Sequence, residues 1–359
     1  MKNLSIDCRM WNSGGIGTYI SNLLPLVIQS QSDIKFNLLC DIDKIKNFDW
    51  GNYNNVNLIN CSSPIYSIAE QYELFRTIPE STDLFWSPHY NIPLLYKGKL
   101  LVTVHDIFHV AMPEYIKGFH KRLYAKWMFN AVKRKANFVI CVSEFTAKEL
   151  VRLIGFEKQK LKIVHNGVNN KWSKVIKRIS PCTKPYIIYV GNVKPHKNLV
   201  RLIQAFETLI FQIPHNLIII GKKDGFITDD KLVKLYANKL ADRVHFTGFV
   251  TEEILYQYII NADALVLPSL YEGFGLPPLE AMACGCPCVV SNIASLPEVC
   301  GDAALYCDPY DVKDIASKIE IVISDVVLRQ KLIELGRKRV KLYTWEKSAK
   351  AFMDVVEKI

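Results

Sequence analysis

Short apolar runs alternate with amphipathic helical patterns along nearly all of the 359 residues. Runs of this kind predict buried strands, which we place at 3–7, 35–40, 57–61, 100–105, 138–142, 186–190, 216–220, 243–246, 264–267 and 288–290. Helical periodicity occupies the intervals between them. Alternating strands and helices predict parallel sheets that are covered by helices on both faces.

The length and one break in this pattern predict two domains. A chain of 359 residues is long for one hydrophobic core, and a hydrophobic content of 50% is enough for two. Periodicity is lost between 166 and 184, where Gly167 and Pro181 fall. We therefore predict an α/β protein with two doubly wound, Rossmann-like domains, 1–175 and 180–342, that face each other across a cleft at the carboxyl ends of their strands.

The net charge of +10 belongs entirely to the first half of the chain. Residues 1–180 contain 24 Lys and Arg against 14 Asp and Glu, whereas residues 181–359 contain 21 of each kind. No acidic residue lies between Glu114 and Glu144. The basic residues of this stretch are Lys117, Lys121, Arg122, Lys126, Lys133, Arg134 and Lys135.

The same basic stretch has the pattern of an amphipathic helix. Phe119, Leu123, Trp127 and Ala131 recur at intervals of four residues. One interpretation is that 117–135 contacts an anionic bilayer, where each basic side chain adds roughly 1 kcal/mol. The other is a domain helix with its apolar stripe in the core and a solvated basic rim. We predict membrane contact for the face as a whole, although such a stripe more often lies in a core.

No run of about 18 apolar residues occurs, and the N-terminal residues lack the apolar stretch of a signal peptide. We therefore expect a cytoplasmic or peripheral protein that does not span a membrane. Of the ten cysteines, Cys284, Cys286 and Cys288 alternate along the chain, without the two-residue gap and second ligand pair of a zinc site. This spacing favours reduced thiols over a metal or redox site.

Residues 268–280 hold the most specific pattern of the chain. Glu272 and Glu280 lie eight positions apart around Gly273-Phe274-Gly275, where an apolar run passes into a helical pattern. A turn of this kind presents backbone N–H groups and the positive end of the helix dipole, which suit a phosphate. Both carboxylates can reach the same crevice and accept hydrogen bonds from sugar hydroxyls. A surface loop with ordinary acids at a helix start is the alternative.

This segment resembles the Glu-x7-Glu signature of the retaining glycosyltransferases of family 4, which have the two-domain GT-B fold. The resemblance covers nearly the whole chain, in order, through the further motifs Gly14-Gly15-Ile16-Gly17, Val102-Thr103-Val104-His105-Asp106, Val142-Ser143-Glu144-Phe145, Asn166-Gly167-Val168, Tyr189-Val190-Gly191-Asn192-Val193-Lys194-Pro195-His196-Lys197-Asn198, Ser295-Leu296-Pro297-Glu298-Val299 and Tyr343-Thr344-Trp345. It implies a nucleotide-sugar-binding second domain and an acceptor-binding first domain, on which the last helix, 345–359, packs back.

The resemblance also implies roles for matching residues. His105 contacts the transferring sugar, and Lys197 neutralises the diphosphate leaving group. Glu272 receives hydroxyls of the donor sugar, and Glu280 receives those of the ribose. The other implied donor-binding residues are Gly15, Gly17, Asn192, Lys194, Phe249, Val250, Gly273, Phe274, Gly275 and Leu276.

Several of these residues have a simpler interpretation. His105 could be a structural histidine, or a metal ligand together with His109, although a strand end lacks the helical spacing of zinc-binding histidines. Lys197 could be a solvated lysine, and Gly15 and Gly17 could serve a tight turn. Many relatives carry an arginine where this chain has Asn192. Either Lys194 supplies that positive charge, or Lys197 and the turn at 273–275 provide most of the stabilisation of the diphosphate.

The sequence thus predicts a metal-independent retaining transferase without a cofactor, acting in bacterial surface glycan synthesis at the inner face of the membrane. The block around Ser295 to Val299 looks most like bacterial mannosyltransferases, which favours GDP-mannose as the donor. The expected partners are the nucleotide sugar and a lipid-linked or polysaccharide acceptor, without nucleic acid. Two alternatives stay open. One is a nucleotide-sugar 2-epimerase of the same fold, and the other is a basic membrane- or nucleic-acid-binding module with a vestigial nucleotide cleft.

Overall fold

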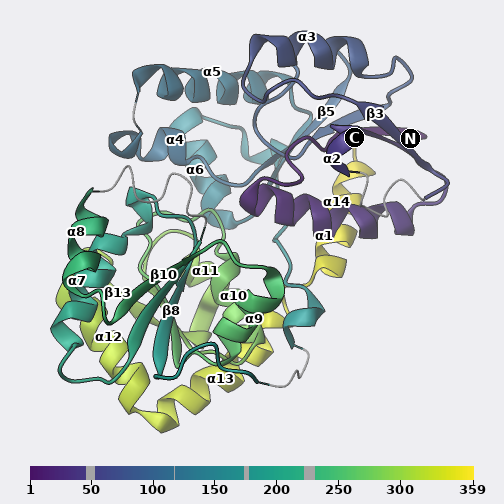
Figure 1. The fold of residues 1–359 in the computed structure, drawn as a ribbon. Helices are drawn as coiled ribbons and strands as arrows, with labels where there is room; N and C mark the ends of the chain where they lie inside the picture. The colour runs from purple at the N-terminus through teal and green to yellow at the C-terminus, as the bar shows by residue number, and fades with distance from the viewer. Residues whose placement is uncertain (46–52, 117, 174–177, 222–230) are drawn as a thin grey trace. The chain divides into compact units, whose positions relative to one another are not determined.

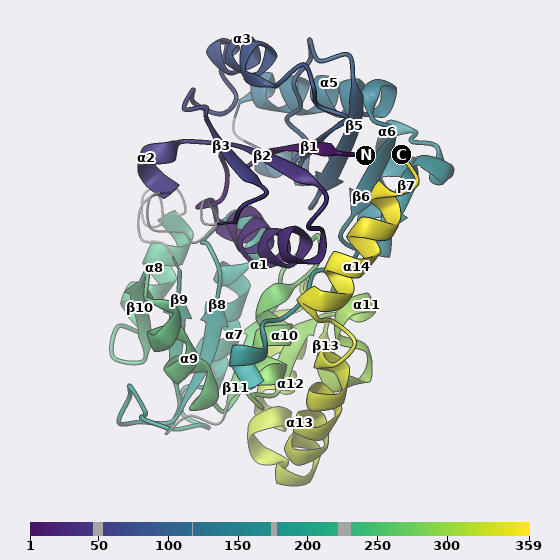
Figure 2. The same cartoon turned by 90° about the vertical axis from the view of Figure 1, so that its right-hand side faces the viewer.

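The computed structural model describes residues 1–45, 53–116, 118–173, 178–221 and 231–359. They form two compact units, one of Met1–Gly167 with Trp345–Ile359 and one of Val168–Thr344 (Figures 1 and 2). The chain passes into the second unit after Gly167, which lies within the stretch 166–184 where periodicity is lost but before the predicted end of the first domain at 175. The last helix belongs to the first unit.

The described part of the first unit contains a seven-stranded parallel sheet in the order β3-β2-β1-β4-β5-β6-β7. Its strands are β1 (Asn3–Asp7), β2 (Lys35–Cys40), β3 (Val56–Asn60), β4 (Leu84–Ser87), β5 (Lys99–Val104), β6 (Phe138–Cys141) and β7 (Leu161–Ile163). The sequence pattern did not reveal β4 and β7. The first is a run of four buried residues with no alternation, and the second is an edge strand of three half-buried residues.

Helices cover both faces of this sheet. They are α1 (Gly14–Ser30), α2 (Ile42–Ile45), α3 (Ile68–Thr77), α4 (Phe108–Ala111), α5 (Phe119–Lys135), α6 (Glu144–Ile154) and α14 (Trp345–Val356). The apolar sides of α1 and α14 share one core cluster with Trp86, whose ring centroid lies 4.4 Å from that of Phe352. Figure 2 shows α14 beside α1. The preceding residue of β4, Phe85, points to the opposite core, which α3, α5 and α6 cover.

The second unit repeats this plan with a six-stranded parallel sheet, in the order β10-β9-β8-β11-β12-β13, within the residues described. Its strands are β8 (Tyr186–Val190), β9 (Asn216–Ile220), β10 (Val244–Gly248), β11 (Ala264–Leu267), β12 (Cys288–Ser291) and β13 (Ala304–Cys307). The sequence pattern ended this sheet at 288–290, so β13 is an addition. It continues the sheet beyond β12 in parallel register.

The helices of the second unit are α7 (Leu199–Leu209), α8 (Lys231–Lys239), α9 (Glu252–Ile260), α10 (Leu276–Ala283), α11 (Leu296–Cys300), α12 (Val312–Ser324) and α13 (Val326–Val340). Figure 1 shows α7 and α12 on one face of the sheet and α9 and α10 on the other. Both sheets are therefore doubly wound, as predicted. Strand order reverses between β1 and β4 in the first sheet and between β8 and β11 in the second. Sheets of this type bind ligands beyond the carboxyl ends of their strands at such reversals.

Candidate functional site

The reversal of strand order in the second sheet brings two predicted segments together. Strands β8 and β11 are neighbours in the sheet, although two further strands separate them along the chain. After β8, the chain places Lys197 in a short 3-10 helix, η5 (Pro195–Lys197), and after β11 it reaches Glu272. Two side chains assigned to catalysis therefore lie beyond adjacent strand ends.

Lys197 and Glu272 form an ion pair. The Nζ atom of Lys197 lies 2.7 Å from Oε1 and 2.7 Å from Oε2 of Glu272. The exposed fractions of the two side chains are 20% and 12%, so the pair is mostly shielded but still reachable from solvent. Charge-assisted hydrogen bonds to both oxygens hold each side chain in one orientation. The sequence predicted that both residues serve the site, but not that they bind each other.

Asn198 fixes the segment that carries Lys197. Its φ of 63° lies in the left-handed region, which asparagine adopts more readily than most residues. Its buried Nδ2 donates to the carbonyl oxygens of Pro268, at 2.9 Å, and Pro309, at 2.6 Å. The N–H of Leu270 also donates to the carbonyl of His196, at 2.7 Å. These bonds tie together the chain beyond β8, β11 and β13.

Ser295 fixes the turn that carries Glu272. Its Oγ lies 2.9 Å from the carbonyl oxygen of Glu272 and 2.7 Å from that of Phe274. A second buried serine, Ser291, donates to the carbonyl of Ser269 at 2.6 Å. Sequence reasoning gave neither Asn198 nor Ser295 a role. Both lie within the motifs that carry the family resemblance, which was the available signal.

The helix α10 begins directly after this turn. Gly275 precedes it with a φ of 108°, and a Cβ there would lie 2.8 Å from Cδ2 of Leu296, so the position requires glycine. Pro277 and Pro278 in the first turn of α10 have no N–H to donate. Within the part of the chain that the structure describes, the N–H groups of Gly275 and Leu276 have no hydrogen-bond partner. They are donors that suit an anion at the helix start.

The remaining predicted donor-binding residues lie beyond the same edge of the sheet. Asn192 and Lys194 are exposed residues that follow β8, and the hydroxyl of Tyr189 donates to the carbonyl of Asn192 at 3.2 Å. Phe249 and Val250 follow β10, the strand at the sheet's edge, and Phe249 is 72% exposed. The predicted donor residues of the second unit thus follow β8, β10 and β11.

Glu280 lies within α10 and is half-buried. Burial raises the pKa of Glu280 to about 7; the negative charge of Glu252 raises it further, and Lys171 lowers it. Glu252 and Lys171 are themselves an ion pair, with 2.5 Å between Oε2 and Nζ. A carboxyl group with this pKa is close to half protonated at neutral pH, so it can either donate a hydrogen bond to a hydroxyl or accept one.

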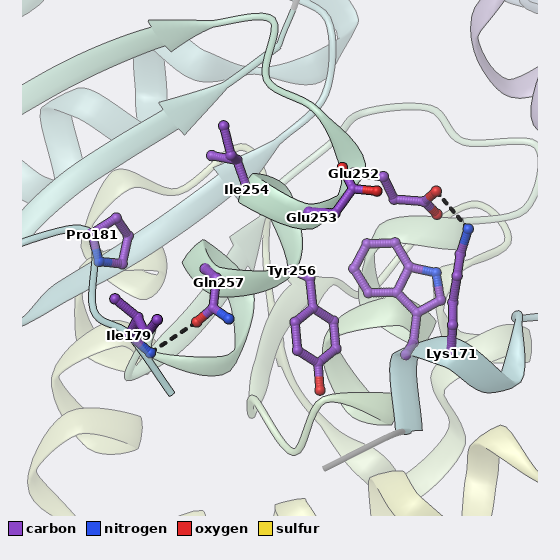
Figure 3. Close-up of a pocket in the computed structure, with 9 residues that line it drawn as sticks. Lys171, Ile179, Pro181, Glu252, Glu253, Ile254, Tyr256 and Gln257 are labelled. Carbon is purple, nitrogen blue, oxygen red and sulfur yellow. Dashed lines mark hydrogen bonds and ion pairs between the residues drawn. The ribbon is translucent and has the colours of Figure 1, made fainter. Parts of the chain in front are cut away.

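A mainly apolar pocket of about 520 Å³ lies beside the Lys171–Glu252 pair (Figure 3). Its lining residues are Lys171, Trp172, Ile179, Pro181, Glu252, Glu253, Ile254, Tyr256 and Gln257. Figure 3 shows the N–H of Ile179 bonded to the side chain of Gln257, at 2.9 Å. None of the predicted site residues lines this pocket, and residues 174–177 lie outside the described residues. We therefore assign it no ligand.

His105 lies just beyond the end of β5 in the first unit. Its Nε2 donates to the carbonyl oxygen of Pro88, at 2.9 Å, and its ring meets that of Tyr19 edge-on at 4.9 Å. Burial lowers the pKa of His105 to about 4. The imidazole is therefore neutral at pH 7, with its proton on Nε2, and Nδ1 can accept a hydrogen bond from a hydroxyl.

The predicted glycine loop of the first unit is in fact the first turn of α1, which starts at Gly14. The sequence placed the helix start near Gly17, because glycines are poor helix formers. Gly17 is needed for packing, since a Cβ there would lie 2.3 Å from the carbonyl oxygen of Trp11. Gly15 is exposed and has open space around its Cα, which leaves room for a close approach by a ligand.

The apolar stripe of the basic helix α5 is mostly exposed. Phe119, Leu123 and Trp127 are 73%, 57% and 48% exposed, so the interpretation of this stripe as core is wrong for these three. The fourth residue of the stripe, Ala131, is buried. The residues of α5 that do pack into the core are Ala125, Met128, Phe129, Ala131 and Val132. Periodicity indicated a stripe but could not tell which face the fold would cover.

The basic residues around this stripe divide into two groups. Lys121, Arg122, Lys126 and Arg134 are exposed. Two others bind backbone carbonyls: Lys133 Nζ donates to Ile154 at 3.1 Å, and Lys135 Nζ donates to Leu94 at 2.7 Å and Tyr96 at 2.6 Å. Lys117 lies outside the described residues.

The ten cysteines are free thiols, and eight of them, including Cys286 and Cys288, are buried. Burial raises the pKa of the Cys286 thiol to about 12, which keeps it protonated and unreactive. Over the described ranges of the chain, no helix combines the length and apolar character that crossing a membrane requires.

Comparison with known proteins identifies the family. A family model for group 1 glycosyl transferases matches residues 170–339, and one for glycosyltransferase family 4 matches residues 78–172. The O-antigen chain mannosyltransferase B of Escherichia coli is 30% identical over 274 residues, which cover 73% of this chain and 71% of that protein. The O-antigen chain mannosyltransferase RfbU of Salmonella typhimurium is 32% identical over 241 residues, 66% of this chain and 64% of the relative.

The fold matches solved structures as well. The sucrose-phosphate synthase of Thermosynechococcus elongatus superposes with a TM-score of 0.79 at 20% sequence identity, over 100% of this chain and 99% of that one. Two Rossmann-like parallel-sheet units are the GT-B architecture that the sequence predicted. With these two family models, the mannosyltransferase relatives and the fold in agreement, the chain belongs to the family 4 glycosyltransferases.

Proposed function

We propose that the protein is a retaining glycosyltransferase that moves a sugar, with mannose favoured, from a nucleotide-diphosphate sugar to a lipid-linked or polysaccharide acceptor. The observation that carries this proposal is the Lys197–Glu272 pair, set beside the unpartnered N–H groups at the start of α10. A cation and backbone donors suit a diphosphate, and a neighbouring carboxylate suits sugar hydroxyls.

The second unit would bind the donor without a metal ion or a further cofactor. Lys197 and the N–H groups of Gly275 and Leu276 would stabilise the negative charge that develops on the diphosphate as it leaves. Glu272 would then exchange its bond to Lys197 for hydrogen bonds from the sugar. Glu280, with a pKa raised by burial to about 7, would bind the ribose hydroxyls.

The first unit would bind the acceptor. His105 Nδ1 would accept a hydrogen bond from a hydroxyl of the transferring sugar. In the reaction, the bond between the anomeric carbon and the phosphate oxygen breaks, and a bond from the acceptor oxygen forms on the same face of the sugar. The proton of the acceptor hydroxyl passes to the departing phosphate. No carboxylate nucleophile is needed, in contrast to a retaining glycosidase.

Mannose and bacterial surface glycans are favoured by the relatives, whose names assign mannose transfer to O-antigen chains in Escherichia coli and Salmonella typhimurium. GDP-mannose is therefore our preferred donor. The acceptor would be carried by a lipid at the inner face of the membrane.

The exposed stripe of α5 supports a peripheral contact with that membrane. Leu123 and Trp127 can enter the lipid headgroup region while Lys121, Arg122 and Lys126 meet anionic lipids. Helix α3 adds Ile68, Tyr72 and Phe75, which are 92%, 53% and 54% exposed. Figures 1 and 2 show α3 and α5 on the same side of the first sheet. The acids of α3 are turned away from this face, because Glu70 is buried and Glu73 binds the backbone of Ser62 and Ser63.

A transfer assay tests the proposal. The full chain is incubated with GDP-mannose, UDP-sugars or dTDP-sugars and a bacterial lipid extract, and the product linkage is read by NMR. We expect mannose to appear in the lipid fraction with the anomeric configuration of the donor. The same incubation without lipid tests the epimerase alternative, since an epimerised nucleotide sugar would favour that reaction. Hydrolysis or no reaction with every donor would contradict the proposal.

A further inference from the structure

A group of tyrosines lies at the carboxyl edge of the first sheet. The ring centroid of Tyr66 lies 6.3 Å from that of Tyr90 and 6.0 Å from that of Tyr124, which it meets edge-on at 88°. Tyr90 stacks on Phe129 at 4.5 Å and lies 6.2 Å from His109. The three tyrosines come from the segments before α3 and after β4 and from α5. Tyr66 is 49% exposed, and the other two are partly exposed.

A carboxylate accompanies these rings. Asp106 follows β5 and is partly exposed, and its Oδ1 accepts the N–H of Phe108 at 2.9 Å. Strand β5 is the neighbour of β4 in the sheet, so Asp106 and Tyr90 follow adjacent strand ends. Burial raises the pKa of the Tyr66 and Tyr90 hydroxyls, and the charge of Asp106 raises both further. Rings, hydroxyls and a carboxylate therefore lie at one edge of the sheet.

Tyr66 is held in an unfavourable backbone conformation. Its φ of 68° is uncommon for a residue with a large side chain and costs on the order of 1 kcal/mol or more. Its N–H donates to Oε2 of the buried Glu70, at 2.7 Å. Strain of this kind persists only where surrounding contacts fix it, and it gathers at binding and catalytic sites. The fold thus sets the orientation of this half-exposed ring before any ligand binds.

A buried polar network provides these contacts. Oε1 of Glu70 accepts Nη2 of Arg9 at 2.7 Å, and Arg9 also binds both carboxylate oxygens of Asp7, at 2.8 and 2.6 Å. The side chains of Asp7 and Glu70 are 0% exposed, and that of Arg9 is 3% exposed. Nε2 of His89 lies 3.2 Å from Oδ2 of Asp7. The network therefore joins the end of β1 to the start of α3 and to the chain beyond β4.

Asn91 extends the network to the second tyrosine. Its Nδ2 donates to Oε2 of Glu70 at 2.7 Å, and its Oδ1 accepts the hydroxyl of Tyr124. The N–H of Asn91 donates to Nδ1 of His89 at 3.2 Å, which leaves the ring proton of His89 on Nε2, facing Asp7. Glu70 thus orients both the backbone of Tyr66 and the side chain of Tyr124.

We propose that Tyr66, Tyr90, Tyr124 and Asp106 form a subsite for one pyranose unit of the acceptor. The apolar C–H face of a pyranose suits an aromatic ring, and its hydroxyls suit phenol groups and a carboxylate. This inference rests on the proposed glycosyl transfer and names the acceptor group that the first unit recognises. Tyr66 lies just before α3, and Tyr124 lies between Leu123 and Trp127 on α5, so the subsite adjoins the face proposed to contact the membrane.

The experiment is saturation-transfer NMR on the full chain with methyl glycosides of mannose, rhamnose, galactose and N-acetylglucosamine, without nucleotide sugar or lipid. It reports saccharide binding alone and needs no turnover. We expect at least one glycoside to give a signal that falls about fivefold or more in Tyr66→Ala. Tyr66→Phe, which keeps the ring, should retain the signal. Tyr236→Ala, which removes a half-exposed tyrosine of the second unit, should also retain it.

The subsite would be overturned by the absence of a signal from every glycoside, by equal signals in wild type and Tyr66→Ala, or by a signal lost in Glu272→Ala but kept in Tyr66→Ala. The last result would place the saccharide at the donor site. Tyr66→Gly removes the ring and relieves the backbone strain, so a folded Tyr66→Gly variant that keeps the full signal would also overturn it. If the protein transfers sugar but its NMR signal does not depend on Tyr66, the subsite is disproved and the proposed reaction stands. If the NMR signal depends on Tyr66 but no sugar is transferred, the proposed reaction is disproved and the saccharide site stands.

Discussion

Lys197 Nζ binds both carboxylate oxygens of Glu272 at 2.7 Å, so the cation and the acid of the candidate donor site hold each other in place. The pair balances charge and fixes both rotamers before a donor binds. In the proposed reaction, a diphosphate that enters would compete with Glu272 for the ammonium group. Glu272 would then be released beside the bound sugar, where its oxygens could accept hydroxyl hydrogen bonds.

This competition predicts that Glu272→Ala separates affinity from turnover. Without the carboxylate, Lys197 is free for phosphate and a nearby negative charge is gone, so the affinity for GDP should rise several-fold. Transfer should fall by about 10²-fold, because the sugar loses its acceptor group. Titration calorimetry with GDP and an initial-rate assay measure the two effects. Weaker GDP binding in Glu272→Ala would contradict the competition.

Arg9→Met should destabilise the first unit by about 3 kcal/mol, because it leaves Asp7 and Glu70 buried without their counter-charge. In the wild type, burial would raise the pKa of Asp7, but Arg9 and His89 more than offset this and hold it well below its usual range. Asp7 therefore stabilises the fold at neutral pH and loses that effect as pH falls below the unfolded value, about 4.

The pH dependence distinguishes this charge effect from a simple loss of packing. In Arg9→Met the unpaired carboxyl groups take up protons more easily. The loss in free energy of unfolding relative to the wild type should therefore be smaller at pH 5 than at pH 8. Calorimetry at both values is the measurement. The control is Arg76→Met, which removes an exposed arginine that stacks on Tyr72 and should cost less than about 1 kcal/mol. Equal losses for the two variants would contradict the role of the network.

His105 should stay neutral through the physiological range. Burial lowers its pKa to about 4, below the ordinary value of 6.5. An unfolded chain therefore takes up a proton at this residue between pH 6.5 and 4 while the folded chain does not, and stability falls as pH decreases through that window. NMR titration of the ring should show a midpoint below 5 and a proton on Nε2. A midpoint near 6.5 would show that the ring is not buried as described.

Replacing the apolar stripe of α5 should weaken membrane binding. The double variant Leu123→Ser, Trp127→Ser removes two exposed apolar side chains, and its affinity for vesicles with anionic lipid should fall about tenfold or more. Phe211→Ser is the matched control, since Phe211 is 100% exposed on the second unit. Co-sedimentation at several salt concentrations is the measurement. Equal binding by the wild type and both variants would remove α5 from the membrane contact.

The sequence was sufficient to predict that Lys197 and Glu272 share a site. Each follows a strand that the apolar pattern identifies, and strand ends of one parallel sheet meet at one edge. Direct pairing could not be predicted, because the segment that carries Lys197 is held by long-range bonds such as that from Asn198 to the carbonyl of Pro309, 111 residues further along the chain. Local pattern contains no information on bonds of that range.

The same limit explains what was missed in the first unit. The buried pair of Arg9 and Glu70 spans 61 residues, and in the sequence both look like ordinary surface charges. Periodicity located the apolar stripe of α5. It could not show that the helix has a second apolar face, or which of the two faces packs against the sheet. Met128, Phe129 and Val132 took the core position, so Leu123 and Trp127 were left outside. The left-handed backbone conformation of Tyr66 could not be predicted either, because the residue is neither a glycine nor an asparagine.

The nucleoside diphosphate is proposed to bind beyond the second sheet through Lys197, and calorimetric titration of GDP, UDP and dTDP measures that binding. We predict that one of these nucleotides binds the wild type, that Lys197→Met weakens its affinity tenfold or more, and that Lys338→Met, which removes an exposed lysine of α13, does not. Lys194→Met should have a smaller effect than Lys197→Met, because Lys194 is exposed and unpaired among the described residues. Equal nucleotide affinity in the wild type and Lys197→Met, or no binding of any of the three, would contradict the claim.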